Sequence, residues 1–269
     1  MKKLLVSSVA AFLVAASGAA FAADLPSRRV APSAPIFVPP SFTWTGFYAG
    51  LNAGYAFGAS NEAKTNGTTG FSNLIAPGIA PGALKVDGSG FIGGGQIGYN
   101  VQMNQLVFGV ETDIQYVDNK KSSSFIGAPI LGTQLNTTAQ SELRYLGTLR
   151  ARVGFVPVDR FLVYATGGLA YGDVRTTTSV SGVQAPALSW AGSKSDTKVG
   201  YTVGAGVEYA ITNNWTLKGE YLYYDLGKQN VAATGNAAVR AVAALNGVDY
   251  LSRVDTKGHI VRAGVNYKF

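Results

Sequence analysis

The sequence contains no cysteine, so neither a disulfide scaffold nor a thiolate metal site can be built from it. A lipid-anchored lipoprotein, which needs a cysteine after its leader, is excluded for the same reason. Charged residues are also scarce, at 14% of the chain, whereas a soluble domain usually carries about a quarter. This deficit indicates that much of the folded surface does not face water.

Long hydrophobic runs are missing beyond the first two dozen residues. No later stretch approaches the roughly 18 consecutive apolar residues of a membrane-spanning helix. The apolar stretch from Leu4 to Ala16 follows Lys2 and Lys3 and precedes Ala20-Phe21-Ala22. This is the anatomy of a secretory signal peptide, and we expect residues 1–22 to be a signal peptide that is removed on export.

The excess of basic residues is small. The formal charge of +7 falls by two when Lys2 and Lys3 leave with the leader, and the remaining basic residues are spread along the chain. Such a distribution does not indicate a nucleic-acid partner.

Proline is concentrated directly after the leader. Half of the ten prolines lie in residues 23–42, where they favour extended conformations and remove donors from any hydrogen-bond ladder. We therefore predict that residues 23–42 form a periplasmic N-terminal segment that acts as a tether.

After the proline-rich stretch, large apolar residues alternate with small or polar ones. Within residues 47–57, one face carries Phe47 and Leu51, and the other carries Gly50 and Asn52. A period of two is typical of a β-strand with one apolar face. The pattern recurs seven times in segments of about ten residues, the length that crosses a bilayer as a tilted strand. The later segments are residues 90–101, 106–117, 143–155, 161–171, 199–211, 215–224 and 257–269.

The connections between these segments alternate strictly between short and long. The short ones lie around Asn104, at 157–159 and at 212–214, and the others run to some two dozen residues or more. Bacterial outer-membrane barrels have short periplasmic turns and long outer loops. We therefore predict an all-β fold, an eight-stranded antiparallel up-and-down transmembrane β-barrel with long extracellular loops, over residues 43–269.

The strand faces opposite the large apolar residues carry most of the charge. A narrow eight-stranded lumen is filled by side chains, so glycine must alternate with long charged groups there. The two signs nearly balance, which favours a buried ion-pair network, because unpaired charges in such an interior are very costly. The charged residues predicted to face inward are Glu111, Asp113, Arg144, Arg150, Arg152, Glu208, Lys218, Glu220 and Arg262.

Aromatic residues dominate the outward face near the strand ends. Amphipathic rings favour the headgroup level of a bilayer and form girdles around membrane barrels. An outward face with almost no charge and with aromatic ends indicates lipid contact. The aromatic residues concerned are Phe47, Phe57, Tyr99, Tyr171, Tyr209, Trp215, Tyr223 and Tyr267.

Five motifs carry a family resemblance: residues 44–50 (WTGFYAG), 164–172 (YATGGLAYG), 203–209 (VGAGVEY), 214–223 (NWTLKGEYLY) and 261–269 (VRAGVNYKF). The chain resembles the small outer-membrane barrel proteins of alphaproteobacteria, the porin-family surface antigens, which are distant relatives of the OmpA membrane domain. The resemblance implies the barrel fold and an outer-membrane location. For activity it implies less: surface exposure, envelope integrity and, in some members, haem binding or proposed pore formation.

The chain ends with Val265, Tyr267 and Phe269 on one strand face. This arrangement looks like the signal by which the barrel-assembly machinery recognises outer-membrane proteins. The alternative is an ordinary amphipathic strand that happens to end in phenylalanine. We expect the assembly machinery as a partner during biogenesis, and outer-membrane lipid and lipopolysaccharide as partners afterwards.

Three features imitate catalytic or cofactor motifs. Gly88–Gly93 (GSGFIG) matches a dinucleotide-binding string, but no helix is predicted after it. Glu111 and Asp113 share a face, as paired catalytic carboxylates would, yet the inward arginines explain them as ion pairs. His259, the only histidine, is predicted near the outer rim without a nucleophile beside it. We therefore predict no catalytic residue, no metal site and no cofactor.

The long connections carry two further features. Residues 236–247 fit a short helix with Asn236 as its N-cap and Gly247 past its end. The first connection is unusually apolar, which suggests either a contact surface or packing over the barrel mouth. Its apolar residues are Phe71, Leu74, Ile75 and Ile79.

These observations favour a structural, surface-exposed envelope protein without catalysis, and at most a narrow channel, because side chains fill an eight-stranded lumen. Two alternatives stay open. One is a porin for small solutes, and the other is capture of haem or a host-surface ligand by the loops.

Overall fold

The structure is a computed structural model in which residues 41–269 form one compact unit. The predicted signal peptide and residues 23–41 of the predicted tether lie outside the described residues. So do the apolar residues Phe71, Leu74, Ile75 and Ile79 of the first connection. The described residues are 42–58, 62–67, 78, 82–85, 88–129, 134–242 and 245–269.

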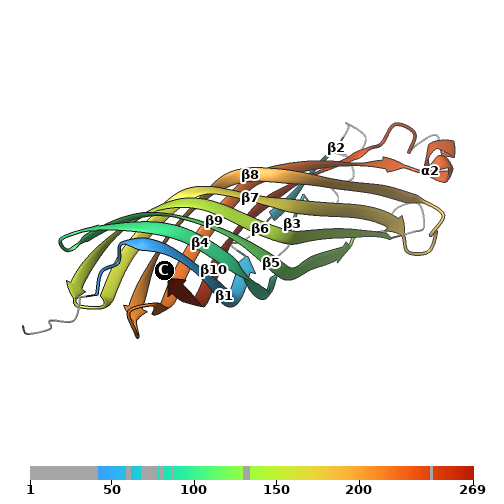
Figure 1. Ribbon diagram of the computed structural model, residues 1–269. Helices are drawn as coiled ribbons and strands as arrows, with labels where there is room; N and C mark the ends of the chain where they lie inside the picture. Colours follow the sequence, from blue (N-terminus) through green and yellow to red (C-terminus); the bar gives the residue numbers. More distant parts are fainter. Residues whose placement is uncertain are drawn as a thin grey trace, which may run out of the picture. The chain divides into compact units, whose positions relative to one another are not determined.

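Eight antiparallel strands close a hydrogen-bonded ring (Figure 1), which confirms the predicted fold class. Neighbours follow the order β1-β4-β5-β6-β7-β8-β9-β10, and β10 pairs back to β1. The short strands β2 and β3 form a hairpin beside the outer part of β10. The elements are β1 (Gly46–Gly58), β2 (Glu62–Gly67), β3 (Ala83–Lys85), β4 (Ser89–Met103), β5 (Leu106–Ile126), β6 (Leu135–Val158), β7 (Phe161–Gly182), β8 (Ser189–Ala210), β9 (Trp215–Gly235), α2 (Ala237–Ala241) and β10 (Tyr250–Lys268).

The three short turns fall where the sequence predicts them. Asn104 and Arg160 adopt positive φ angles of 56° and 67°, which tighten the β4–β5 and β6–β7 turns. In the β8–β9 turn, Thr212 Oγ1 accepts from the backbone N–H of Trp215 at 3.0 Å.

The strands run much further outward than predicted. β6 begins at Leu135 rather than near residue 143, and β7 ends at Gly182 rather than near residue 171. Threonine, serine and valine continue the alternation there without a large apolar outward face, which was the feature used to recognise strands. We call this outer part the extension; it comprises residues 118–126, 135–144, 173–182, 189–198, 225–235 and 250–257, with β2 and β3.

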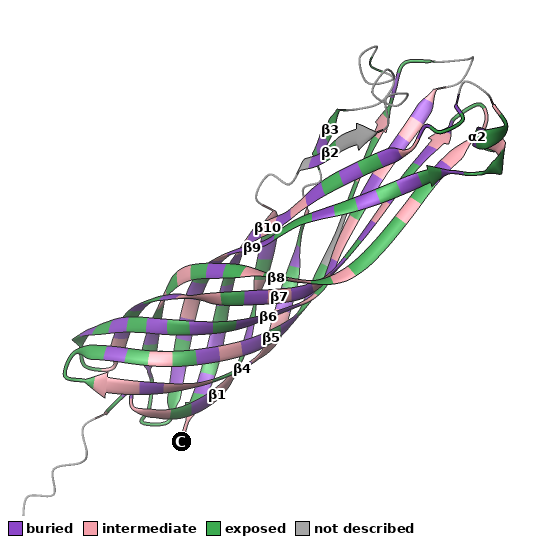
Figure 2. Ribbon diagram, turned by 90° about the horizontal axis from the view of Figure 1, so that it is seen from above, coloured by how far each residue is buried: buried purple, intermediate pink, exposed green. Residues whose placement is uncertain are grey.

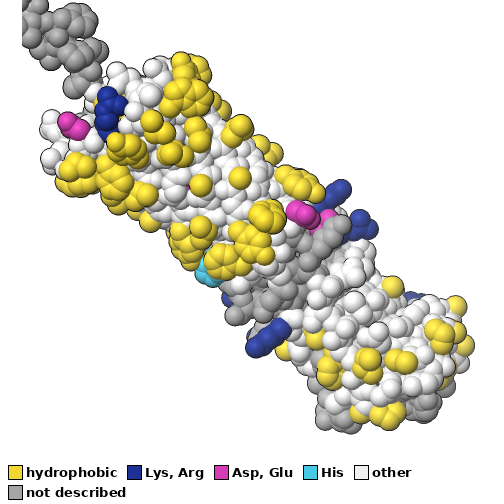
Figure 3. Space-filling view, turned by 90° about the horizontal axis from the view of Figure 1, so that it is seen from below, with side chains coloured by type: hydrophobic (Ala, Val, Ile, Leu, Met, Phe, Trp, Pro, Cys, Tyr) yellow, Lys and Arg dark blue, Asp and Glu magenta, His cyan; other side chains and the backbone are white. Residues whose placement is uncertain are grey.

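Below the extension, large apolar side chains cover the outside of the barrel in a band that we call the belt (Figure 3). From Phe47 to Phe57 the belt has a height of about 25 Å, at roughly 3.4 Å per residue and a 45° tilt. This matches the hydrocarbon thickness that an outer-membrane barrel spans. The eight aromatic residues predicted for the girdles all have outer-face positions with partial or full exposure.

Buried and exposed residues alternate along the strands in both parts (Figure 2), but the polarity of the two faces reverses between the belt and the extension. Inside the belt the buried residues are mostly charged or polar, whereas the extension buries Leu135, Val180 and Trp190 in an apolar cluster. On the outside of the extension, Arg175 and Ser179 are exposed. The extension is therefore built like a barrel that stands in water, and the belt like one that stands in lipid.

Arg144 was predicted to face inward, and this prediction is wrong: its side chain is 57% exposed and pairs with Asp173 at 3.2 Å. The β6 register shifts between Leu143 and Leu146, which are both buried. A bulge of this kind inserts a residue and reverses the alternation beyond it. A strictly alternating pattern cannot foresee it.

The helix α2 is shorter than predicted and ends at Ala241. Asn236 caps it as expected, because its Oδ1 accepts from the Val239 N–H at 3.0 Å. Val239 packs into the apolar cluster of the extension. In the described part of the chain, no helix is long and apolar enough to cross a bilayer.

Candidate functional site: a charged cluster inside the barrel

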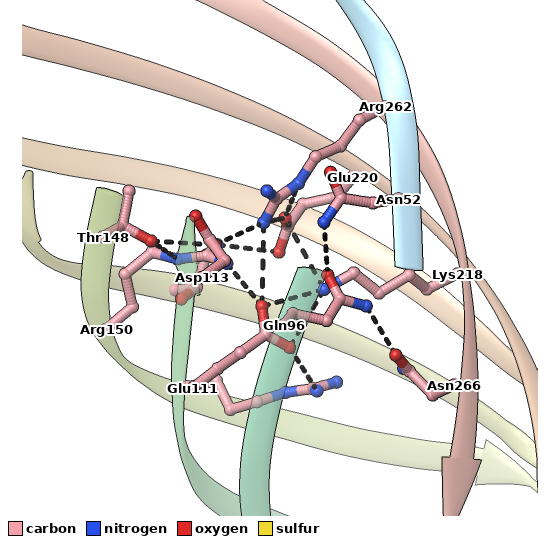
Figure 4. Close-up of polar contacts among 12 residues, drawn as sticks. Asn52, Gln96, Glu111, Asp113, Thr148, Arg150, Lys218, Glu220, Arg262 and Asn266 are labelled. Carbon is pink, nitrogen blue, oxygen red and sulfur yellow. Dashed lines mark hydrogen bonds and ion pairs between the residues drawn. The ribbon is translucent and has the colours of Figure 1, made fainter. Parts of the chain in front are cut away.

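Eight of the predicted inward charges lie in one cluster inside the belt (Figure 4). Strand register places Glu111 opposite Arg150, Glu208 opposite Lys218, and Glu220 opposite Arg262. Each cross-strand pair thus joins an acid to a base. The side chains are at most 3% exposed, and the members are Glu111, Asp113, Arg150, Arg152, Glu208, Lys218, Glu220 and Arg262.

Arg150 lies at the centre of the cluster. Its guanidinium contacts Glu111, donates to Asp113 Oδ2 at 2.7 Å and donates to Glu220 Oε1 at 2.9 Å. Its Nε donates to Thr148 Oγ1 at 2.9 Å. One cation therefore holds carboxylates from two different strands.

The other two central cations share the same carboxylates. Lys218 Nζ donates to both Glu111 oxygens, at 2.8 and 2.9 Å. Arg262 Nε donates to Glu220 Oε2 at 2.7 Å, and its Nη2 donates to Asp113 Oδ2 at 3.0 Å. Each carboxylate is consequently bound by more than one donor, as a low-dielectric interior requires.

Arg152 extends the cluster toward the periplasmic end. It donates to Glu208 Oε2 at 2.7 Å and to the Tyr48 hydroxyl at 3.1 Å, and it stacks 4.0 Å above the Tyr164 ring. Tyr48 in turn donates to Glu111 Oε2 at 2.7 Å. Four acids and four bases are joined in this way, so the formal charge of the cluster is zero.

Neutral polar residues complete the cluster, although the sequence-based prediction of the ion-pair network did not include them. Asn52 donates to Gln96 at 3.0 Å, and Asn266 donates to Glu208 at 2.8 Å. These residues occupy the same alternate positions along the strands as the inward charges, and that alternation indicates that they face the lumen. The neutral members are Tyr48, Asn52, Gln96, Thr148, Tyr164, Thr216 and Asn266.

Glycine makes room for these side chains. A Cβ at Gly98 would lie 2.3 Å from the Tyr48 hydroxyl, and a Cβ at Gly168 would lie 2.1 Å from the Leu149 carbonyl oxygen. Both distances are too short for real contacts, so the Tyr48 ring and the β6 backbone can lie this close only because these two positions have no side chain.

Apolar layers lie on both sides of the charged cluster. Toward the periplasm, Trp44, Val107 and Leu162 pack together, and Phe42 covers them. Phe42, the last residue of the predicted tether, therefore packs against the barrel. Toward the extension, the second layer buries Ala56, Ile92, Val117, Leu143, Leu146, Ala170, Val174, Leu222, Tyr224, Leu226 and Ile260.

The cluster does not have the arrangement of a catalytic site. Glu111 and Asp113 are both engaged by cations, so neither is free to accept a substrate proton. His259 lies on the outer face, where its Nδ1 is 2.6 Å from the Tyr221 hydroxyl and its ring stacks on Phe57. Gly88–Gly93 leads into strand β4 rather than into a helix. Among the described residues, no group of acids and histidines is arranged to hold a metal ion.

The three residues of the predicted assembly signal share the outer face of β10. Val265, Tyr267 and Phe269 are 41%, 38% and 75% exposed. The Phe269 N–H donates to the Phe47 carbonyl at 3.0 Å, and the rings of Tyr267 and Phe269 meet edge to face. The chain terminus thus closes the ring against the first strand.

Comparison with known proteins gives matches along the whole barrel. A family model described as outer membrane protein beta-barrel domain matches residues 8–269. The 31 kDa outer-membrane immunogenic protein of Brucella melitensis is 39% identical over 100% of both chains. The 25 kDa outer-membrane immunogenic protein of Brucella abortus is 29% identical over 100% of this chain and 99% of that protein. The crystal structure of OprG from Pseudomonas aeruginosa matches with a TM-score of 0.48 at 16% identity, and covers 85% of this chain and 98% of that one.

Proposed function

Because the chain belongs to the family of outer membrane β-barrel proteins, we propose that it is a closed structural barrel without a conducting channel or a catalytic site. It is located in the bacterial outer membrane, where the belt contacts lipid. The extension then projects from the outer leaflet as a paired β-sheet and forms the surface that the protein presents outside the cell.

The packing of the lumen supports a closed barrel. The charged cluster has no net charge, and apolar layers around Trp44 and around Leu222 lie below and above it. A hydrated ion would have to cross both layers and then displace a salt bridge. Apolar constrictions of this kind exclude water and ions.

The extension supports a role at the cell surface. Its outside is hydrophilic, and strands β6, β7 and β8 are hydrogen-bonded to one another almost to their tips. Two relatives are named as immunogenic outer-membrane proteins, and we propose that this chain is likewise a surface antigen whose epitopes are formed by the extension.

The boundary between belt and extension supports contact with lipopolysaccharide. Arg144 and Lys228 are 57% and 55% exposed just outside the outer aromatic rim. Cations at this level are suited to the phosphate groups of an anionic lipid headgroup.

Planar-bilayer recording tests the closed barrel. The refolded chain, whose folded state is checked by its heat-modifiable migration on gels, is added to a bilayer at ±100 mV beside a wide porin as a positive control. We expect no unitary conductance steps from this chain. Reproducible steps from the folded protein would overturn the proposal in favour of the porin alternative.

A further inference from the structure

Strands β8 and β9 separate within the extension and meet again near its tip. They pair without interruption from Ala210–Thr216 to Tyr201–Asp225, and then again only at Ala191–Thr234 and Trp190–Gly235. Residues 192–200 and 226–233 between these points do not pair with each other, although the structure describes every one of them. We call these two facing stretches the seam.

Each strand of the seam is held on its other side. β8 stays paired with β7 throughout, with Lys194 opposite Thr176, and β9 stays paired with β10, with Lys228 opposite Asp255. Each strand therefore has one satisfied edge and one open edge, and the two open edges face each other. An open edge is a template for a further strand.

Glycine brings the strands together at both ends of the seam. A Cβ at Gly192 would lie 2.2 Å from the Ala232 carbonyl oxygen, and a Cβ at Gly200 would lie 1.8 Å from the Asp225 carbonyl oxygen. The strands are thus in close contact at these two points, which makes the seam a bounded interruption of the ring.

A side chain, rather than a strand, reaches across the middle of the seam. Gln229 Nε2 donates to the Lys194 carbonyl oxygen at 3.5 Å, which is a weak hydrogen bond. Its Oε1 accepts from Thr176 Oγ1 at 3.0 Å. The buried Thr178 hydroxyl, on the neighbouring inner position of β7, has no hydrogen-bond partner. One buried polar group beside the seam therefore lacks a hydrogen-bond partner.

The inner face of the seam carries two lysines and one aspartate, a small excess of positive charge. By register Lys194, Asp196 and Lys198 have inward positions on β8, yet their side chains are 50%, 38% and 25% exposed. Asp196 forms ion pairs with both lysines, at 3.1 Å with Lys194 and 3.9 Å with Lys198. Across the seam, Lys228 is 55% exposed and lies 3.8 Å from Asp255 of β10. The two unpaired stretches themselves carry three lysines and one aspartate.

We propose that the seam binds an extended acidic peptide as an added β-strand. The backbone of the peptide completes the ladders of β8 and β9, and its inward carboxylates pair with Lys194 and Lys198. Addition of a strand to an open edge is a known mode of peptide recognition in which backbone hydrogen bonds supply affinity. Charge complementarity selects an acidic rather than a basic segment. Because Gly192 and Gly200 are already in close contact with β9, the paired segment of the partner lies between them, opposite residues 193–199.

The test uses the folded full-length mature chain in lipid nanodiscs and a nine-residue peptide that alternates aspartate with valine. We expect this peptide to bind, and the same peptide with lysine in place of aspartate not to bind. The double variant Lys194→Glu/Lys198→Glu should lower the affinity at least tenfold, whereas Arg253→Glu, which reverses an exposed cation on β10, should leave it within twofold. Lys228→Glu, on the outer face of the sheet, should lower the affinity less than the double variant does.

Hydrogen exchange distinguishes an added strand from simple charge attraction. On binding, the amides of residues 192–200 and 226–233 that face the seam should exchange at least tenfold more slowly, while residues 173–182 of β7 stay unchanged. A peptide with proline at alternate positions cannot form the ladder and should not bind. Equal binding of the proline peptide, or seam amides already protected in the free protein, would overturn the proposal.

Discussion

Arg150 and Arg144 lie on the same strand and show how burial decides the contribution of a charge. Arg150 is enclosed and bound to three carboxylates, from Glu111, Asp113 and Glu220, whereas Arg144 is exposed and meets only Asp173. Removing Arg150 leaves three buried negative charges one cation short, and removing Arg144 leaves a carboxylate that water can solvate.

We therefore expect Arg150→Met to lower the free energy of unfolding by about 3–5 kcal/mol. The matched control Arg144→Met should lower it by less than about 1 kcal/mol. Urea titration of the refolded protein in detergent micelles, followed by tryptophan fluorescence, measures both values. Similar losses for the two variants would show that the cluster does not stabilise the barrel.

Gly168 on the inner face of the sheet has no space for a side chain, whereas Gly219 on the outer face has. A Cβ at Gly168 would lie 2.1 Å from the Leu149 carbonyl oxygen, whereas a Cβ at Gly219 would meet nothing within 4 Å. We expect Gly168→Ala to reduce the folded fraction on refolding several-fold and Gly219→Ala to leave it unchanged, as measured by heat-modifiable migration on gels. If Gly168→Ala folds normally, the crowding of the lumen is less than the structure indicates.

The charged members of the cluster could be predicted from the sequence because a charge cannot lie on the lipid-facing side of a strand and must face the lumen. Tyr48 and Tyr164 also have an inward phase, but tyrosine suits an interfacial girdle as well as a crowded lumen, so the sequence alone did not assign them to the cluster. Arg144 shows the opposite error. Its phase was predicted from strict alternation, and a bulge in β6, seen in the pairing of β6 with β7, reversed it.

At the scale of single elements, β10 carries two roles that can be separated. Its inner face contributes Arg262 to the cluster, and its outer face ends in Phe269, which is 75% exposed. A side chain this exposed adds little packing to the folded barrel. Its contribution to recognition by the assembly machinery can therefore be measured separately from its contribution to the stability of the barrel.

We expect Phe269→Ala to lower the amount of assembled protein in cells several-fold while its refolding in detergent stays close to wild type. Phe91→Ala is the matched control, because Phe91 is also outward and 75% exposed but lies far from the terminus. Quantitative immunoblotting of heat-modifiable protein in outer-membrane fractions compares the two. Equal assembly of both variants favours the alternative, an ordinary strand that ends in phenylalanine.

The extended strands mark the limit of what the sequence could predict about the elements. In β7, the residues after Tyr171 bury Val174, Thr176 and Thr178 and expose Arg175 and Ser179. Small side chains on both faces give a weak periodic signal. Pairing with β6 and β8 determines the strand here, and those partners are distant in the sequence.

For the whole molecule, the reversal of polarity along the barrel decides where a charge is tolerated. Ala165 and Ser179 are both outward and exposed on β7, but Ala165 lies in the middle of the belt and Ser179 lies in the extension. Lipid surrounds the first position and water surrounds the second.

Ala165→Arg should therefore destabilise the barrel in lipid vesicles by about 2–4 kcal/mol, the usual effect of arginine near the bilayer midplane. Ser179→Arg should change stability by less than about 0.5 kcal/mol. Denaturant titration in vesicles of one lipid composition gives both values. If the order were reversed, the assignment of belt and extension to lipid and water would be wrong.

The short tips of the extension restrict how the outer surface can vary between related chains. Residues 127–134, 183–188 and 236–249 join the long strands at the outer end of the extension. Because one added residue inside a paired strand turns its apolar lining outward unless a bulge absorbs it, we expect insertions and deletions in these hairpins to concentrate at the tips. Within the paired strands the surface then changes mainly by exchange of one side chain for another, so an antibody that binds the sheet contacts positions at constant spacing.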